Sequence, residues 1–367
     1  MRPVLVLIFH ATAPADAGPL VSALAEGRGA LAERQRTAFL AAGADSVVVV
    51  AGPPDGLSFG ERLVGAIGGP GGPGGVVVLG SGSIPLAGAA DLRRFVEVAA
   101  GPGGHALANN RYSADVVAVS RAADLAGLPP LPADNALPRW LEERAGVAVT
   151  DLRSRWRLGV DVDTPLDLIV LRDPAASAIH SAAPLIGERL AALAGVLSNR
   201  RAELLVAGRI SATTLSWLQR GVACRVRALV EERGLRAASR LAQSDTPTTA
   251  RPPRSILGEL LDRDGPESLA ATVARLAEAT VIDTRVLLAH RNGADESTWP
   301  DAEARFASDL LLPESVSDPW LRALTASAAS SPSDHPILLG GHTLVNGGLR
   351  LLAARAGLAA RARAGAR

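Results

Sequence analysis

The sequence predicts an α/β protein with a mostly parallel, three-layer sheet, followed by a second, smaller α/β domain. Short apolar runs typical of buried strands alternate with helical patterns from the beginning of the chain, and the connections between them are short. The length of 367 residues favours two domains, and the 48% of apolar residues can fill two cores. We therefore expect residues 1–175 to form the first domain and residues 176–367 the second.

The first domain should contain four strands in its first part and a strand–helix pair near its end. The segment Gly68–Gly75 is expected to be a surface loop and not a phosphate cradle, because its prolines lack N–H donors and it precedes a strand. Leu158–Arg172 should form a short strand and then a helix opened by Thr164 and Pro165. The other expected strands are Val4–Phe9, Ser46–Ala51, Val76–Leu79 and Val116–Val119, and the other expected helices are Ala30–Ala42, Ser58–Ile67 and Asp91–Ala100.

The second domain repeats the alternation after a linking helix, Leu185–Leu197. Its polar, proline- and threonine-rich stretch Gln243–Pro253 is expected to be a loop. The expected strands are Leu204–Ala207, Cys224–Val230, Val281–Ile282 and Ile337–Leu339, and the expected helices are Ala212–Arg220, Ile256–Leu261, Leu269–Glu278 and Leu349–Ala360.

The composition excludes two kinds of site. All 38 basic residues are arginine. A Schiff-base enzyme and a Walker P-loop both need a lysine amine. Any contact with phosphate must therefore come from arginine, from backbone N–H groups or from a metal ion. The net charge of +1 gives no indication of a nucleic-acid partner, so we expect none.

The single cysteine, Cys224, rules out an intramolecular disulfide, and its apolar surroundings in the sequence predict a buried side chain. The opening run Met1–Phe9 is too short to span a membrane and lacks a signal-peptide pattern. We therefore expect a cytoplasmic protein without a membrane partner.

Four segments of the first half follow one another in the order found in a known family. They are Arg34–Gly52, the GERL-containing Phe59–Leu63, the strand-like Val76–Leu86 with the sequence VVVLGSGSIPL, and Asp161–Leu168 with the sequence DVDTPLDL. Together they resemble the nucleotidyltransferases with a glycosyltransferase-A-type fold, and among these the guanylyltransferases that act on molybdopterin or 2-phospho-lactate. The second half resembles no family that we can name.

The resemblance implies transfer of a nucleotidyl group, such as guanylyl from GTP, to a phosphorylated small-molecule cofactor precursor. The partners would then be a nucleoside triphosphate and that phosphorylated molecule, with Mg²⁺ as cofactor. Catalysis of such a transfer is mainly positioning and stabilisation of charge on phosphoryl oxygens. The oligomeric state is not predicted.

Asp161 and Asp163 are the candidate catalytic and metal-binding residues. They alternate with Val162, so on an extended segment both carboxylates would face the same side. Carboxylate oxygens are ligands that Mg²⁺ prefers. The family carries its first metal-binding aspartate where this chain has Ser81, Gly82 or Ser83, and a serine hydroxyl is a poorer ligand.

The nucleotide contacts that the resemblance implies lie at two places. Gly80, Ser81 and Ser83 end the strand that precedes the missing aspartate. The family's glycine-rich loop with arginine and lysine is absent after the first strand, where His10–Pro14 stands instead. Arg28 and Arg34 could replace the missing lysine at the phosphates, or they could be solvated arginines of a loop.

Two further polar clusters are candidate binding elements, each with a plain structural alternative. Asn109, Asn110, Arg111 and Asp115 could bind the acceptor or the nucleotide, or could form a turn in which asparagine accepts an unusual backbone conformation. The run that begins Gly340, Gly341, His342 follows the last expected strand. It could bind an anion through its N–H groups and the imidazole, or could be a tight strand-to-helix turn.

Three hypotheses for function follow. The first is a Mg²⁺-dependent nucleotidyltransferase that uses Asp161 and Asp163. The second is a nucleotide-binding or regulatory protein that has lost catalysis with the aspartate that Ser81–Ser83 replace. The third is an enzyme whose site lies in the second domain and involves Asp283, Arg285 and His342.

Overall fold

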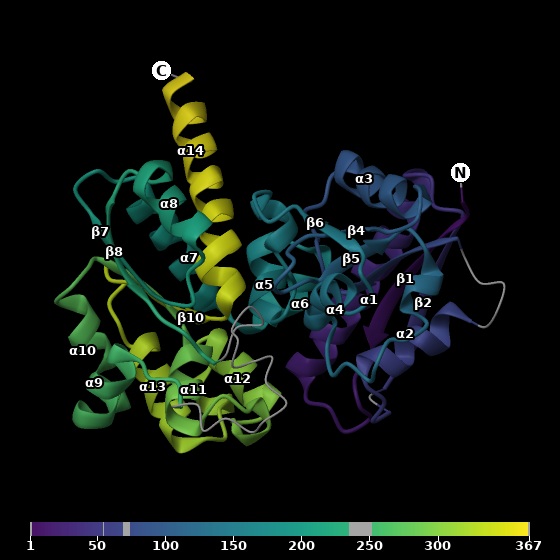
Figure 1. Ribbon diagram of the computed structural model, residues 1–367. Coiled ribbons are helices and arrows are strands. Elements are labelled where there is room, and N and C mark those ends of the chain that lie inside the picture. Colours follow the sequence, from purple (N-terminus) through teal and green to yellow (C-terminus); the bar gives the residue numbers. More distant parts are fainter. Residues whose placement is uncertain (1, 54, 69–73, 235–251, 366–367) are drawn as a thin grey trace. The chain divides into compact units, whose positions relative to one another are not determined.

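A computed structural model describes residues 2–53, 55–68, 74–234 and 252–365 (Figure 1). The fold is α/β, as the sequence predicts, and the chain divides into two compact units that each contain one sheet. The first unit comprises the chain up to Ala17 and Ala25–Val162. The second comprises Gly18–Leu24 and the described residues from Asp163 onward, so the division falls ahead of the expected boundary at residue 175.

The first unit contains a six-stranded sheet in the order β2-β1-β3-β5-β4-β6. Only β5 runs antiparallel to its neighbours, so the sheet is mostly parallel. The four strands expected from apolar runs are present, and β4 and β6 are two further short strands. The bounds are β1 (Val4–Ala11), β2 (Ser46–Gly52), β3 (Gly75–Gly80), β4 (His105–Ala108), β5 (Val116–Val119) and β6 (Ala148–Asp151).

Helices cover both faces of this sheet and complete the three layers. Val6 and Ile8 of β1 belong to the core beneath Phe39 and Phe95, whereas Leu7 points to the opposite core beneath Leu63. Burial on both faces explains why the strands have continuous apolar sequences. The helices are α1 (Pro19–Ala41), α2 (Phe59–Ile67), α3 (Ala89–Ala100) and α4 (Leu137–Glu143), with short 3₁₀ turns at Ala122–Leu125, Asp134–Ala136 and Trp156–Gly159.

The second unit contains a four-stranded, wholly parallel sheet in the order β10-β9-β7-β8. Its strands are β7 (Glu203–Gly208), β8 (Arg225–Val230), β9 (Ala279–Asp283) and β10 (Ile337–Gly340), and they confirm the four expected runs. The helices are α5 (Pro165–Leu171), α6 (Ser177–Ala182), α7 (Pro184–Leu197), α8 (Ala212–Gly221), α9 (Ile256–Asp264), α10 (Leu269–Ala274), α11 (Thr284–Asn292), α12 (Ala302–Asp309), α13 (Pro319–Ala329) and α14 (Leu349–Gly365). A π-helical turn, Leu344–Gly348, leads into α14, and 3₁₀ turns lie at Pro174–Ala176, Pro266–Ser268, Glu296–Thr298 and Pro313–Ser315.

Several expected boundaries need correction. The helix expected at Ala30 begins at Pro19, and the helix expected to reach Glu278 ends at Ala274 because strand β9 begins at Ala279. The segments Gly68–Gly75 and Gln243–Pro253 lie mostly outside the described residues.

Cys224 is buried just before β8, with 7% of its surface exposed, as its apolar surroundings in the sequence predict. Burial raises the pKa of its thiol, so the group stays protonated at neutral pH.

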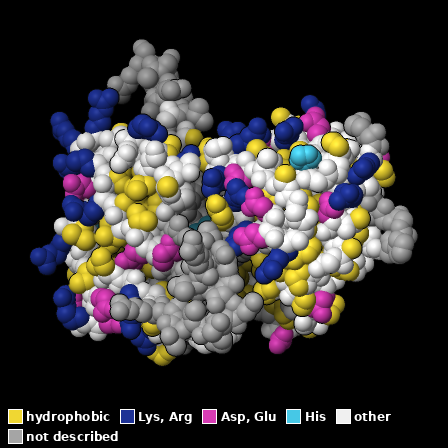
Figure 2. All heavy atoms as spheres, in the orientation of Figure 1, with side chains coloured by type: hydrophobic (Ala, Val, Ile, Leu, Met, Phe, Trp, Pro, Cys, Tyr) yellow, Lys and Arg dark blue, Asp and Glu magenta, His cyan; other side chains and the backbone are white. Residues whose placement is uncertain are grey.

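Arginine and acidic side chains are interspersed on the face shown in Figure 2. Within the described part of the chain, no helix combines the length and apolarity needed to cross a bilayer.

Gly208, at the end of β7, has a left-handed backbone conformation (φ +134°), and a Cβ there would lie 2.3 Å from the Cβ of Asp283. Gly208→Ala is therefore expected to lower the free energy of unfolding by about 3 kcal/mol, from backbone strain and overpacking combined. Gly293 has a similar conformation (φ +89°) with nothing near the added methyl group, so Gly293→Ala should cost only about 1 kcal/mol. Urea denaturation of both variants tests this, and equal losses would contradict the clash at Gly208.

Candidate functional site

The topology of the first sheet marks one place where ligands are expected. From β1 the chain passes to β2 on one side and then returns to β3 on the other side, so the strand order reverses between β1 and β3. In open α/β sheets, ligands bind in the crevice outside the carboxyl ends of the strands at such a point. The residues at this position are His10, near the end of β1, and Ser81, directly after β3.

His10 and Ser81 contact one another across this point. The imidazole Nδ1 lies 3.0 Å from the Ser81 hydroxyl, and the Ser81 N–H donates to the carbonyl of Phe9 at 2.8 Å. Ser81 is buried, with 4% of its surface exposed, and His10 is half-buried. The sequence had given His10 only as part of the segment that replaces the glycine-rich loop, so this pairing was missed.

The late aspartate segment lies against the tip of the serine-bearing strand. Ser83 and Asp161 form an isolated antiparallel bridge, and the Val162 N–H donates to the carbonyl of Gly82 at 2.9 Å. The short strand expected before α5 is reduced to this bridge. Two segments that are far apart in the sequence are therefore adjacent in the first unit.

Two side chains of helix α1 donate hydrogen bonds to the backbone of these adjoining segments. Arg28 Nε donates to the carbonyl of Val162 at 2.6 Å, and the buried side chain of Gln35 donates to the carbonyl of Ser83. Arg28 thus lies on a helix, which corrects the alternative that it is an arginine of a loop, and Arg34 lies within the helix expected from Ala30 onward. Arg28 is half-buried beside the site, whereas Arg34 is exposed.

The backbone directly after Ser83 is strained. Ile84 has a φ of +45°, a left-handed conformation that is unfavourable for a β-branched residue. Its side chain is buried in the core, with 2% exposed, and this packing holds the conformation. Strained residues of this kind cluster at functional sites, and Ile84 directly follows the Gly80–Ser83 segment.

The cluster Asn109–Asp115 connects the antiparallel strands β4 and β5. The Asn109 amide donates to Asp115 at 2.7 Å and to the Leu158 carbonyl at 2.8 Å, and its oxygen accepts from the N–H of Asp115. These are the contacts of a turn, and Asn110 likewise accepts from the N–H two residues ahead. Arg111 forms an ion pair with Glu142. A role in binding the acceptor stays a prediction for these residues.

Asp163 begins the second unit, directly before helix α5. Thr164 caps this helix and Pro165 takes its first position, as the sequence predicts. The Asp167 carboxylate accepts from the N–H of Asp163 at 3.0 Å and of Thr164 at 2.8 Å, which fixes the backbone that carries Asp163.

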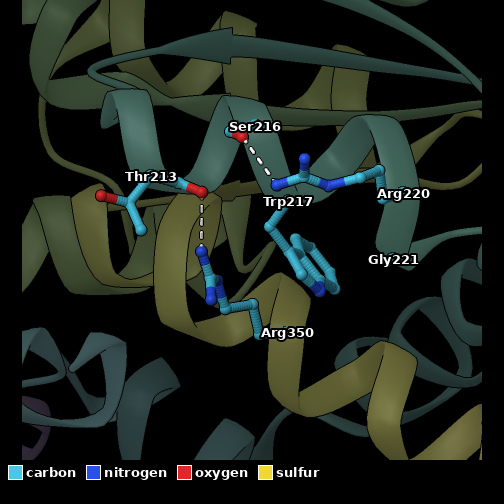
Figure 3. A pocket seen from close by; sticks show the side chains of 6 residues that line it. All are labelled: Thr213, Ser216, Trp217, Arg220, Gly221 and Arg350. Carbon is cyan, nitrogen blue, oxygen red and sulfur yellow. Dashed lines mark hydrogen bonds between the residues drawn. The ribbon is translucent and has the colours of Figure 1, made fainter. Parts of the chain in front are cut away.

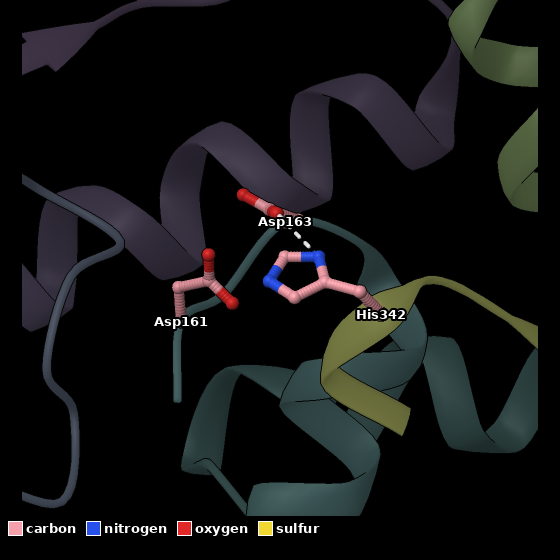
Figure 4. Close-up of side chains that lie close together, drawn as sticks. All are labelled: Asp161, Asp163 and His342. Carbon is pink, nitrogen blue, oxygen red and sulfur yellow. Dashed lines mark ion pairs between the residues drawn. The ribbon is translucent and has the colours of Figure 1, made fainter. Parts of the chain in front are cut away.

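The imidazole of His342 faces the Asp163 carboxylate, with 3.9 Å between Nδ1 and Oδ2 (Figure 4). Asp161 is joined to Asp163 through one residue, so the chain itself keeps the two carboxylates near one another. Within the second unit, Asp163 and His342 each offer a ligand atom, and these atoms lie within 4.8 Å of one another. A carboxylate and an imidazole are suitable ligands for a divalent metal ion. The sequence predicted the aspartates as metal ligands but not the histidine.

The run Gly340–His342 is less open than expected. A Cβ on Gly340 would lie 2.7 Å from the side chain of Leu344, so close packing accounts for this glycine, while Gly341 has more space around it. The helical turn begins at His342, which shortens the expected loop.

Asp283 and Arg285 are buried, with 1% and 6% of their surfaces exposed. Asp283 caps helix α11, and Arg285 forms a two-pronged ion pair with Asp309 at 2.5 and 2.6 Å. Burial acts to lower the pKa of Arg285, but the Asp309 carboxylate outweighs it and raises the pKa, so the guanidinium is charged. These contacts give both residues a structural role and weaken the hypothesis of an active site built from them.

His10 should be neutral at pH 7, because burial lowers its pKa and the nearby Arg28 charge lowers it further. Arg28→Ala is expected to raise this pKa towards its ordinary value of 6.5. A titration of the histidine ring protons by NMR, with His10→Gln for assignment, measures the change. Protonation favours the unfolded chain, so the stability that His10 contributes is complete above pH 6.5 and declines as the pH falls below it. An unchanged pKa of His10 in Arg28→Ala would contradict the effect of the Arg28 charge on His10.

The candidate site of the first unit thus consists of the reversal point of an α/β sheet, Asp161 and the cationic helix residue Arg28. No protein-family model and no curated protein matches the chain. Among solved structures, it is similar to one described as a "putative nucleotide-diphospho-sugar transferase" from Desulfovibrio desulfuricans G20, with 18% identity and a TM-score of 0.36, over 51% of this chain and 98% of that one. A likeness this distant identifies no activity and no site residue.

Proposed function

We propose that the first unit binds a nucleoside triphosphate outside the carboxyl ends of β1 and β3, and that the protein transfers the nucleotidyl group to a phosphorylated small molecule. The observation that carries the proposal is the meeting of Gly80–Ser83, Arg28 and Asp161 at the reversal point of the sheet. The DVDTPLDL segment, which resembles a nucleotidyltransferase motif, supports it.

Each group has a role that its chemistry suits. Arg28 supplies a permanent positive charge for phosphate oxygens. Asp161 would hold a Mg²⁺ or Mn²⁺ ion together with phosphate oxygens and water, because carboxylate, phosphate and water oxygens are the ligands that Mg²⁺ takes. A bound divalent cation would neutralise charge on the phosphoryl oxygens. Ser81 and Ser83 would donate hydrogen bonds to the nucleotide.

A second candidate is nucleotide binding without transfer. Ser81 is engaged with His10, and Gly80–Ser83 contains no carboxylate where related enzymes carry an aspartate. A protein that kept the pocket but used it for regulation would show nucleotide binding that does not depend on a metal.

Thermal unfolding with GTP, ATP, CTP or UTP, each with and without Mg²⁺, separates these functions. A nucleotide at 100 times its Kd stabilises the folded state by about 2.7 kcal/mol, which corresponds to a rise in Tm of about 5–10 °C. We expect a rise that needs Mg²⁺ for one nucleotide and that is lost in Arg28→Ala. The exposed Arg94 of α3 offers a matched control, and Arg94→Ala should keep the rise.

Transfer itself is measured by pyrophosphate release in the presence of phosphorylated acceptors. A metal-independent rise without pyrophosphate release would favour the second candidate. If no nucleotide raises the Tm, neither candidate stands.

A further inference from the structure

The second unit contains a pocket that the proposed function does not use. It has a volume of about 340 Å³ and lies between α8 and the first turn of α14 (Figure 3). This volume is in the range of sites for small molecules. The lining residues are Thr213, Ser216, Trp217, Arg220, Gly221 and Arg350.

Arg350 is held in a fixed position at this pocket. Only 9% of its surface is exposed, and it is one of the residues that line the pocket. Nη2 donates to the carbonyl of Thr213 at 2.8 Å, and the guanidinium lies 5.1 Å from the centre of the Trp217 ring. Burial lowers the pKa of Arg350, but an arginine keeps its charge in proteins. The pocket therefore has a preorganised cation against an aromatic face.

The end of helix α8 adds a second cation. Arg220 Nη2 donates to the hydroxyl of Ser216 at 3.0 Å, on the exposed side of the helix. Gly221 makes room for the indole, since a Cβ there would lie 2.1 Å from Trp217 Nε1. A larger residue at 221 would push the aromatic ring out of its place.

The charges of the residues that line the pocket indicate which kind of ligand it binds. Of the six lining residues, two are arginines and none is acidic. Guanidinium groups bind phosphate through paired N–H donors. A tryptophan face stacks on planar rings. We propose that this pocket binds a small phosphate monoester that carries a planar ring, of the mononucleotide kind.

Calorimetric titration of the full chain with AMP, inorganic phosphate and adenosine tests the assignment. AMP should bind most tightly, phosphate more weakly because it lacks the ring, and adenosine least because it lacks the charge. Arg220→Ala should weaken AMP binding about tenfold, which corresponds to about 1.4 kcal/mol. Arg220 is exposed, so this change leaves the fold intact.

Three variants make the test specific. Arg275→Ala removes an exposed arginine elsewhere in the second unit and should leave the affinity unchanged. Arg94→Ala removes an exposed arginine of the first unit and should also leave it unchanged. Gly221→Ala should weaken binding by displacing the indole, and circular dichroism checks its fold.

Quenching of tryptophan fluorescence by AMP, lost in Trp217→Phe, would place the ligand at this wall. Three results would overturn the proposal: no binding of AMP at millimolar concentration, equal weakening by Arg220→Ala and Arg275→Ala, or loss of binding only in Arg28→Ala. The last result would assign AMP to the first unit and would leave the proposed function standing.

Discussion

Asp309→Ala is expected to lower the free energy of unfolding of the second unit by about 3–5 kcal/mol. The carboxylate is wholly buried and pairs with Arg285, of which 6% is exposed. Its removal leaves a guanidinium charge in a low-dielectric interior without its main counter-ion. Denaturation in urea, followed by circular dichroism, measures the loss.

Two controls show that burial is responsible. Asp264 pairs with Arg263 at the surface, and Asp264→Ala should change the stability little, because water screens an exposed pair. The double variant Arg285→Met/Asp309→Leu should recover much of the stability, since it removes both charges. A loss below about 1 kcal/mol in Asp309→Ala would mean that the pair behaves like a surface pair.

Asp163→Asn is expected to weaken Mn²⁺ binding by about 100-fold or more. Removing a group that only hydrogen-bonds to a metal ligand typically weakens metal affinity by about 10–100-fold. Asp163→Asn removes a charged ligand itself, so its effect should be at least as large. His342→Gln should weaken binding less, since it removes a neutral ligand. Titration of the full chain with Mn²⁺, followed by electron paramagnetic resonance, measures both affinities directly and needs no enzyme activity.

Asp295→Asn is the matched control for this experiment. Asp295 is an exposed aspartate that caps a 3₁₀ turn of the second unit. Its variant loses the same charge and should keep the affinity for Mn²⁺. Equal affinity in all variants, or equal weakening by Asp295→Asn, would contradict a metal site at Asp163 and His342.

The long buried strands could be predicted because their signal is local. β1 and β3 are continuous apolar runs whose side chains are largely buried, as expected when both faces of a sheet are covered. The edge strand β2 has an equally apolar sequence but is partly exposed, with 46% of the surface of Val48 accessible. β4 and β6 have only four residues each, with sequences HALA and AVTD. They are strands because β4 pairs with β5 on one side and with β6 on the other, which no local pattern shows.

Helix boundaries depended on packing as well as pattern. Thr164 and Pro165 mark the beginning of α5 in the sequence, and the structure confirms them. Glycines 27 and 29 favoured a loop, but they lie within α1. Gly29 lies close to His10, since a Cβ added at Gly29 would be 3.2 Å from the imidazole Nε2. Contacts in the folded chain thus outweighed local propensity.

The candidate site was predictable in its parts but not in its pairings. Asp161, Asp163 and the serine-bearing tip were proposed from the resemblance of their segments to nucleotidyltransferase motifs, and the alternation with Val162 placed both carboxylates on one side of an extended segment. The contact between His10 and Ser81, and that between Asp163 and His342, join segments far apart in sequence. For Asn109 the sequence left two alternatives open, a binding element or a turn. Its polar atoms form the hydrogen bonds of a turn.

Burial of the Cys224 thiol limits how readily two copies of the protein become linked by a disulfide in air. Disulfide exchange proceeds through the thiolate, and both burial and the raised pKa of Cys224 suppress that species. Covalent dimers can therefore form only from molecules whose β8 region has opened. The amount of cross-linked dimer that accumulates without reductant is thus a record of unfolding events.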